Sequence, residues 1–318
     1  MASAHVFLNP GAAFGSGRER WARVEPELER RLGPLEVEET RPLEDMARRV
    51  RGLLDEGEMR LVAAGGDGTV NLLVNAIMAS DVGTDEAARA GGGAPTLGAV
   101  GLGSSNDYHK PYGASDTIEG MPAHVDFESA RERDVIRIDL ETSGRKTTRY
   151  ALINASIGVT AAANARFSDP NWVVRLARPF SVDAAISAAI LSVLARWRDI
   201  TAAVATDGRE AEMVSVTNLG VYKSPHFGGE LRYDEPVERD DGLLGVALCE
   251  GMNALEVLRT VSGLRRGSFA GRPKTRTWTA RGLEVRGDRE FALEMDGEVV
   301  RARGMRLAVH GRRLECCV

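Results

Sequence analysis

The run Gly65-Gly66-Asp67-Gly68-Thr69 joins an apolar segment to a segment with helical spacing. Its glycines allow a sharp turn that brings backbone N–H groups close to an anion, and the N-terminus of a helix favours negative charge. The Asp67 carboxylate suits Mg²⁺, or the water shell of the metal, better than a bare phosphate. A tight strand-to-helix turn capped by Asp67 and Thr69 explains the same residues. Alone, the run supports phosphate binding and a plain turn about equally.

Two further turns combine glycine with polar side chains after apolar segments. The turn from Gly101 through Gly103-Ser104-Ser105-Asn106-Asp107 offers hydroxyl, amide and carboxylate groups to a ligand. It is a poor dinucleotide fingerprint, because Asn106 replaces the final glycine of GxGxxG. The turn from Asn9-Pro10 to Gly17-Arg18 supplies backbone donors and a guanidinium suited to phosphate. Turns that follow successive strands of an α/β sheet meet where ligands bind, so together they predict a ligand crevice.

The elements that position these turns alternate between strand and helix up to about residue 120. Short apolar runs predict strands, and amphipathic spacing predicts helices between them. The predicted strands are 6–8, 60–64 and 97–100, and the predicted helices are 18–32, 43–54 and a segment that begins after Thr69. This alternation is typical of a layered α/β domain with a mostly parallel sheet.

Past about residue 125 the pattern changes to short β-rich runs separated by turn signals such as Asp241-Gly242 and Asp296-Gly297. The predicted strands are 135–140, 150–153, 200–205, 213–217, 245–249, 282–285, 291–295 and 305–309. Such a succession predicts an antiparallel sandwich. A helix over 182–197, with apolar residues on one face, is expected to pack against it.

Length and composition limit the class of protein. A chain of 318 residues is more than one core usually supports, so two domains are expected. The net charge of -5 gives no case for nucleic-acid binding. Cys249, Cys316 and Cys317 form no disulfide framework or zinc spacing, which suits a reducing cytoplasm. The apolar stretch 184–195 is shorter than the roughly 20 residues that span a bilayer, and the start lacks the pattern of a signal peptide. Any membrane contact is therefore expected to be peripheral.

In chain order, the turns after the first strands resemble the NPxxGxG, GGDGTxNE and GTxNDFAR elements of the diacylglycerol kinase and sphingosine kinase family of lipid kinases. Later matches to that family are Asn218, Gly228-Gly229, Asp241-Gly242-Leu243-Leu244 and Asp296-Gly297-Glu298. The resemblance covers nearly the whole chain. Because GGDGT is shared with NAD kinases and phosphofructokinases, the later matches are what favour lipid kinases.

This resemblance implies an N-terminal α/β domain of phosphofructokinase and NAD kinase type over 1–125, which binds the nucleotide and which residues 305–318 return to complete. It implies a β-sandwich domain over 126–304 for the lipid. The expected activity is transfer of the ATP γ-phosphate to a diacylglycerol-like or sphingoid-like hydroxyl with Mg²⁺, at the cytoplasmic inner face of a membrane. Whether the chain forms a homodimer stays open.

The resemblance also implies roles for single residues. It places Asp67 near Mg²⁺ and the ATP phosphates, and it makes Glu298, with Asp296 close by, the carboxylates that deprotonate the lipid hydroxyl. Without it, Asp296-Gly297 is a plain hairpin turn. The nucleotide-binding positions are Asn9, Pro10, Arg18, Gly65, Gly66, Gly68, Thr69, Gly103, Ser104, Asn106 and Asp107.

A structural Mg²⁺ is implied at Asp241, helped by the carbonyl groups of Val237 and Leu243, with Asp134 linked through water. An oxygen-only set suits Mg²⁺. Asp240 carries the same charge, so it is an alternative ligand one residue away.

The sequence also departs from the family pattern. Leu72 stands where the family often has Glu, and Ser105, Tyr108, His109 and Lys110 replace Gly, Phe, Ala and Arg. Two alternatives remain open: a soluble-metabolite kinase of NAD kinase type, and a nucleotide- or lipid-binding regulator without catalysis, which Leu72 favours. The basic residues between Arg265 and Arg276 are explained by a solvated surface or by attraction to an anionic membrane.

Overall fold

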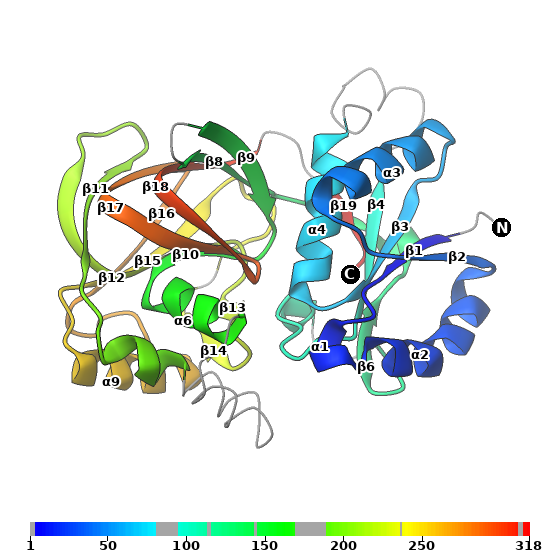
Figure 1. Cartoon of the computed structure of the whole chain (residues 1–318), viewed down its shortest axis with the longest axis horizontal. Coiled ribbons are helices and arrows are strands. Elements are labelled where there is room, and N and C mark those ends of the chain that lie inside the picture. The colour runs from blue at the N-terminus through cyan, green and yellow to red at the C-terminus, as the bar shows by residue number, and fades with distance from the viewer. Residues whose placement is uncertain are drawn as a thin grey trace. The chain divides into compact units, whose positions relative to one another are not determined.

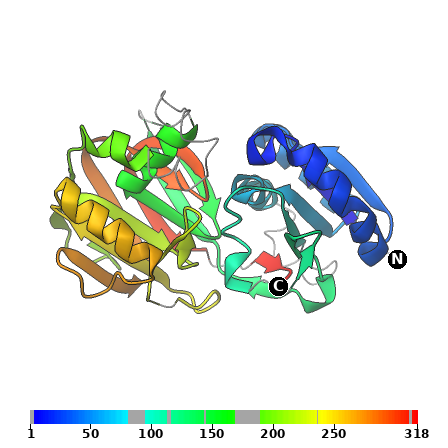
Figure 2. The same ribbon diagram turned by 90° about the horizontal axis from the view of Figure 1, so that it is seen from below.

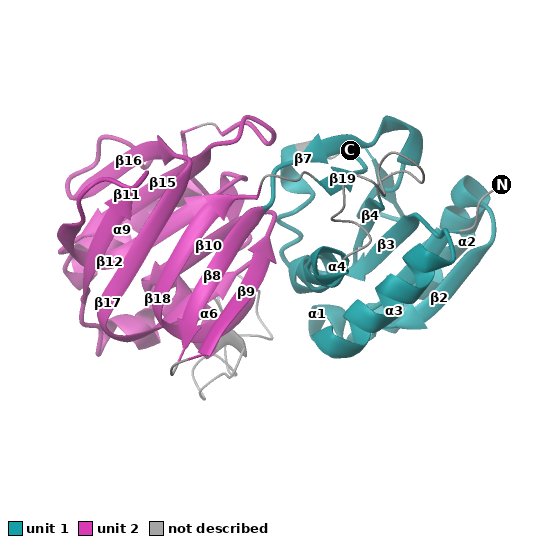
Figure 3. Ribbon diagram, turned by 90° about the horizontal axis from the view of Figure 1, so that it is seen from above, with its two compact units in different colours: residues 1–135, 311–318 teal, residues 136–310 magenta. Residues whose placement is uncertain are grey.

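The computed structural model describes residues 4–80, 95–112, 116–142, 145–168, 189–235, 237–310 and 314–318. The chain divides into two compact units, coloured separately in Figure 3. Unit 1 is Met1–Val135 with Gly311–Val318, and unit 2 is Ile136–His310. The first part of the helix predicted over 182–197, residues 182–188, lies outside the described residues, and 189–194 is helical.

Unit 1 is built on a mixed sheet with the strand order β2-β1-β3-β4-β19-β7 (Figure 1). Its strands are β1 (Ala4–Leu8), β2 (Leu35–Glu39), β3 (Arg60–Gly65), β4 (Thr96–Gly101), β5 (Thr117–Ile118), β6 (Met121–His124), β7 (Arg131–Arg133) and β19 (Leu314–Cys316). The adjacent strands β2, β1, β3, β4 and β19 pair in parallel, in that order across the sheet. Strand β6 pairs antiparallel with β4, and β7 pairs antiparallel with β19. The predicted α/β domain with a mostly parallel sheet is therefore confirmed.

Helices cover this sheet because their apolar residues recur every three or four positions. They are α1 (Ala12–Gly15), α2 (Gly17–Leu32), α3 (Leu43–Asp55) and α4 (Asp67–Ala79), with short 3₁₀ turns at Lys110–Tyr112 and Phe127–Ser129. On α2, Trp21, Val24 and Leu28 are buried in one cluster with apolar residues of β1, β3 and β4. On the same unit, α3 contacts α4. This packing holds α2 and α4 beside the strand ends where the glycine-containing turns begin.

Unit 2 is an antiparallel β structure in the order β16-β15-β12-β10-β17-β18-β8-β9, and β11 pairs with β12 and β17. Its strands are β8 (Ile136–Thr142), β9 (Arg145–Ala151), β10 (Asn154–Gly158), β11 (Ile200–Thr206), β12 (Glu212–Tyr222), β13 (His226–Phe227), β14 (Leu231–Arg232), β15 (Leu244–Glu250), β16 (Thr275–Ala280), β17 (Gly282–Met295) and β18 (Glu298–Val309). Along β15, Val246 and Leu248 join one apolar cluster while Ala247 and Cys249 join another. This alternation confirms the predicted sandwich-like domain.

The last long strand belongs to unit 2, contrary to the expectation that 305–318 completes the first domain. β18 pairs with β8 and β17, and its residues Met305 and Leu307 are buried in the core of unit 2. β19, by contrast, pairs with β4 and β7 of unit 1. The first unit also continues to Val135 rather than to residue 125. The apolar residues of β18 are buried in the core of unit 2, so the segment that returns to unit 1 is shorter than the predicted 305–318.

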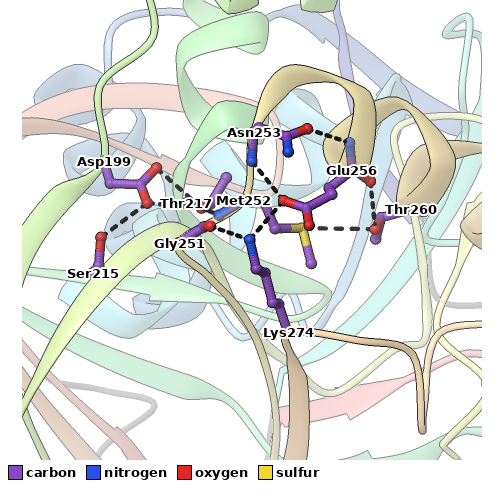
Figure 4. Close-up of polar contacts among 9 residues, drawn as sticks. All are labelled: Asp199, Ser215, Thr217, Gly251, Met252, Asn253, Glu256, Thr260 and Lys274. Atoms are coloured by element: carbon purple, nitrogen blue, oxygen red, sulfur yellow. Dashed lines mark hydrogen bonds and ion pairs between the residues drawn. The ribbon is translucent and has the colours of Figure 1, made fainter.

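Two helices of unit 2, α6 (Val159–Ser168) and α9 (Ala254–Arg265), lie on its β structure (Figure 2). Polar contacts hold the start of α9 in place (Figure 4). Thr217 Oγ1 accepts a hydrogen bond from the Met252 N–H at 2.8 Å. Asn253 and Glu256 form a reciprocal capping box, and Lys274 Nζ donates to Glu256 at 2.7 Å. Among the described residues, no helix is long and apolar enough to cross a bilayer.

Candidate functional site

The turns that follow β1, β3 and β4 are joined by hydrogen bonds at one edge of the sheet of unit 1. Asn9 Nδ2 donates to Thr69 Oγ1 at 3.1 Å, and the Asn9 N–H donates to the Ala64 carbonyl at 2.9 Å. The Leu102 N–H donates to the Gly65 carbonyl at 2.7 Å. The carboxyl ends of neighbouring parallel strands meet there, so the structure brings together the turns that the sequence predicted to form one crevice.

Glycine is required at Gly103 and at Gly65 because neighbouring residues leave no room for a Cβ atom. A Cβ atom on Gly103 would lie 2.5 Å from Gly66 Cα, and one on Gly65 would lie 2.1 Å from Thr69 Oγ1. The predicted nucleotide residue Asn106 has a φ of 49° and closes its own turn. Its Oδ1 accepts from the Gly103 N–H at 3.0 Å, and its Nδ2 donates to the Gly101 carbonyl at 3.2 Å. Asn106 therefore shapes the turn through its side chain.

Asp67 is the first residue of α4 and is half-buried. Its Oδ1 accepts a hydrogen bond from the Tyr108 N–H at 2.9 Å, which links the turn after β3 to the turn after β4. No side chain caps the α4 N-terminus at Gly66. An uncapped helix N-terminus suits a phosphate, and a carboxylate beside it suits Mg²⁺, so the groups present fit both.

Two arginines follow the turn after β1, and the nucleotide-binding role of the first, Arg18, stays a prediction. Arg18 pairs with Glu39, and its side chain is 69% exposed. The sequence analysis did not single out Arg20, whose Nη1 donates to the carbonyls of Leu102 and Gly103 at 3.0 and 2.9 Å. Arg20 thus ties the start of α2 to the turn after β4. Arg20 lies three residues after the buried Gly17 and four before the buried Val24, so the helical period places it on the buried face of α2. This spacing could have identified Arg20 from the sequence.

The other predicted nucleotide residues lie on the same three turns. Pro10 and Gly68 are half-buried, and Ser104 is exposed. Asp107 is buried and forms an ion pair with Lys110. The Asp107 carboxylate is therefore buried against Lys110 within the turn and is not open to solvent.

A buried histidine pair lies behind the turn after β4. His109 Nδ1 is 2.6 Å from His124 Nδ1, and the rings stack with centroids 4.8 Å apart. Burial, and then the proximity of His124, lowers the pKa of His109 from 6.5 to about 3. His109 is therefore neutral at pH 7, and one ring nitrogen of the pair must donate to the other.

In unit 2, Asp296 lies at the hairpin between β17 and β18 with a φ of 46° and is 3% exposed. Its carboxylate accepts backbone N–H groups from Leu152, Ile153 and Asn154 at 2.7, 3.0 and 2.8 Å. A buried carboxylate with these donors anchors the hairpin. Asp296 thus has an anchoring role, its catalytic role stays a prediction, and Glu298 is the exposed carboxylate of the hairpin.

Glu294 is a buried carboxylate that the sequence analysis did not identify. It is 8% exposed, and it accepts hydrogen bonds from Ser156 Oγ and from the Gly297 N–H, both at 2.8 Å. Thr160 Oγ1 extends the network, because it lies 3.0 Å from Ser156 Oγ and 2.7 Å from Asn218 Oδ1. Glu294 interrupts an apolar run two residues before Asp296, and an acidic residue in such a run was the available signal.

The predicted Mg²⁺ site contains a lysine. Lys223 Nζ donates to Asp241 Oδ1 and to the Leu243 carbonyl, both at 2.7 Å. Burial raises the pKa of Asp241, but hydrogen bonds from Lys223 and from the Leu243 N–H outweigh burial and lower it. Val237 is half-buried beside an apolar cluster, and Asp134 is a buried residue of unit 1. The residues do not fit the implied Mg²⁺, because the ammonium group already holds two of its predicted ligands.

The described residues contain no group of three or more His, Cys, Asp or Glu side chains that could hold a metal ion. At the position predicted for Mg²⁺, Asp67 supplies one carboxylate at the start of α4. Mg²⁺ usually keeps several waters and binds through one or two carboxylates plus substrate phosphates, so a single carboxylate is consistent with it.

Comparisons with known proteins agree with this architecture. The family described as the diacylglycerol kinase catalytic domain matches residues 3–140, and the YegS C-terminal NAD kinase beta sandwich-like domain matches residues 154–318. A diacylglycerol kinase from Bacillus anthracis str. Sterne has 15% identity and a TM-score of 0.66, with 99% of this chain and 96% of that chain covered. Another structure from that organism has 16% identity, the same coverage and a TM-score of 0.69. These likenesses show the shared fold. No curated protein sequence matches the chain.

Proposed function

This chain belongs to the bacterial diacylglycerol kinase-like family, and we propose that it transfers the γ-phosphoryl group of ATP to the hydroxyl group of a diacylglycerol-like or sphingoid-like lipid. The observation that supports this most is the junction of the turns after β1, β3 and β4. There, Asn9 contacts Thr69 and Asp67 contacts the backbone of Tyr108. Positioning of phosphates by backbone groups and an acidic side chain is what phosphoryl transfer requires of a protein.

In this proposal the N–H groups at the start of α4 and in the turn after β4 bind the phosphates of ATP, while the Gly103 N–H stays bound to Asn106 Oδ1. Asp67 holds Mg²⁺, which would neutralise charge on the phosphates. Glu298 accepts the proton of the lipid hydroxyl, because it is the exposed carboxylate of the hairpin. Asp296 positions that hairpin through its bonds to the backbone of Leu152, Ile153 and Asn154.

A phosphorylation assay tests the proposal. Purified protein, Mg²⁺ and γ-labelled ATP are incubated with vesicles that carry diacylglycerol, sphingosine, ceramide or phosphatidylglycerol, and separately with NAD. We expect label in one lipid and none in NAD, and loss of that label in Asp67→Ala. Label in NAD alone would favour a soluble-metabolite kinase. No transfer to any acceptor, with Asp67→Ala leaving ATP hydrolysis unchanged, would favour the regulator that Leu72 suggests.

We also propose that the protein contacts an anionic membrane from the cytoplasmic side, through the outward face of α9. Leu255 and Leu258 are 54% and 38% exposed, and Arg259 and Arg266 lie on the same exposed face. Such a pairing of apolar and basic residues suits the boundary between headgroups and acyl chains.

Other basic residues near α9 are engaged within the protein. Lys274 pairs with Glu256, and Arg276 pairs with Glu212 through both carboxylate oxygens at 2.9 and 3.0 Å. Of the basic residues that the sequence shows between 265 and 276, Lys274 and Arg276 are therefore less suited to bind anionic lipids, because their charges are already paired.

A further inference from the structure

Lys223 is the residue after β12, and its side chain is 1% exposed. A buried ammonium is costly unless it is paired and hydrogen-bonded. Its Nζ meets that condition with Asp241 Oδ1 and the Leu243 carbonyl, each at 2.7 Å. Asp241 Oδ1 also accepts the Leu243 N–H at 2.9 Å, so the carboxylate closes the turn that the lysine holds.

A divalent ion held by these oxygens would have to take the place of the ammonium group. Mg²⁺ demands near-octahedral oxygen coordination at about 2.0–2.1 Å and is repelled by a fixed positive charge beside it. The distances of 2.7 Å are those of charge-assisted hydrogen bonds from nitrogen. We propose that the ammonium group of Lys223 is a built-in cation that replaces a structural metal ion at Asp241, so that unit 2 folds without one.

The built-in cation is linked through the backbone to the hairpin that carries Glu298. The Lys223 N–H donates to the Ile153 carbonyl at 2.9 Å. The Ile153 N–H in turn donates to Asp296 Oδ1 at 3.0 Å. Lys223 thus contacts both segments: its side chain holds the Asp241 turn, and its backbone N–H is bound to the segment that binds Asp296. This inference goes beyond the proposed kinase activity and holds for any acceptor.

The first test uses the wild-type protein without nucleotide. We expect no stoichiometric Mg²⁺ or Ca²⁺ in elemental analysis of purified protein, and the same thermal midpoint in EDTA, Mg²⁺ and Ca²⁺. The Asp67→Ala variant is measured in parallel, because it removes the metal position of unit 1. A bound structural metal would raise the midpoint by at least about 5 °C at concentrations well above its dissociation constant. Such a rise in both proteins, or stoichiometric metal in both proteins, would overturn the proposal.

The second test compares two substitutions of the lysine. Lys223→Ala removes the ammonium and leaves room beside the oxygens of Asp241 and Leu243, so we expect a lower thermal midpoint that Mg²⁺ or Ca²⁺ partly restores. Lys223→Met keeps the length of the side chain without its charge, so we expect a lower midpoint that no metal restores. Lys146→Ala, at an exposed position of β9, is the control and should change nothing.

A Lys223→Met variant whose thermal midpoint equals that of the wild type would show that the lysine only fills space, and it would contradict the proposal. So would a Lys223→Ala variant whose midpoint equals that of the wild type. If the Lys223→Ala variant fails to fold when no metal is present, it is refolded in Mg²⁺, in Ca²⁺ and in EDTA. Folded protein from the metal buffers but not from EDTA supports the proposal. If no buffer gives folded protein, the metal content and thermal midpoint of the wild type decide.

Discussion

The two units solve the same problem, the positioning of charged groups, in different ways. In unit 1 the candidate site is made of glycine-containing turns that approach one another closely, as Gly103 approaches Gly66. In unit 2 the anchoring contacts are made by buried charged side chains, such as Asp296 with Leu152 and Lys223 with Asp241. Close approach of backbones therefore dominates the first site, and buried charged side chains dominate the second. The following changes test this contrast, from the largest expected effect to the smallest.

Asp296→Ala should destabilise the protein by about 3–5 kcal/mol, because it leaves the buried N–H groups of Leu152, Ile153 and Asn154 without their acceptor. Urea unfolding measures this free energy. Glu298→Gln, at the exposed end of the same hairpin, should leave stability unchanged and lower lipid phosphorylation by about 100-fold or more. If instead Asp296→Ala is stable and inactive, Asp296 is catalytic and the anchoring role is wrong.

Gly103→Ala should cost about 2–3 kcal/mol of unfolding free energy, because the new methyl group would meet Gly66 Cα at 2.5 Å. The control is Gly52→Ala in α3, where no atom lies within 4 Å of the added Cβ, and which should stabilise the protein by up to about 1 kcal/mol. Urea titration of both variants gives the two signs. Equal effects would mean that the turns of unit 1 do not touch as described.

Arg20→Ala should weaken binding of a non-hydrolysable ATP analogue by about tenfold and lower stability by about 1–2 kcal/mol, because the carbonyls of Leu102 and Gly103 lose a charged donor. Arg18→Ala should change stability by less than about 0.5 kcal/mol, since its ion pair with Glu39 is exposed. Calorimetric titration and urea unfolding measure both quantities. A larger loss of affinity in Arg18→Ala would restore the role that the sequence predicted for it.

The double variant Leu255→Glu, Leu258→Glu should lower binding to vesicles of phosphatidylglycerol and phosphatidylcholine by about tenfold, with no change in secondary structure. Met213→Glu is the control, because Met213 is an apolar residue that is 65% exposed and belongs to β12 rather than to α9. Co-sedimentation over a range of salt concentrations measures the binding. Equal loss in the control would exclude α9 as the specific surface.

Stability should fall as the solution is acidified from pH 7 to pH 5.5, by about 1 kcal/mol from His109 alone. The pKa of His109 is lowered in the folded protein, from 6.5 to about 3, so the unfolded chain takes up a proton in this range while the folded chain does not. Urea midpoints across the range measure the slope. His109→Asn should flatten it, and an unchanged slope would show that another group titrates.

The regular elements of unit 1 were predictable because their periodicity is local. The helix predicted over 18–32 is α2, Gly17–Leu32, and the strand predicted over 60–64 is β3, Arg60–Gly65. The edge strand β2, Leu35–Glu39, was not predicted. Its glutamates hide the strand pattern, and it becomes a strand by pairing with β1.

The sequence by itself determined the α/β and β-rich halves, the glycine turns at the ends of strands, and the Asp296-Gly297 hairpin. These features follow from periodicity and from backbone preferences that act over a few residues. The tertiary structure alone decided that Asp296 is saturated by distant N–H groups, that Arg20 rather than Arg18 joins two turns, and that Lys223 lies where a metal was expected. Such roles depend on which atoms folding brings within about 3 Å, and no spacing along the chain specifies that.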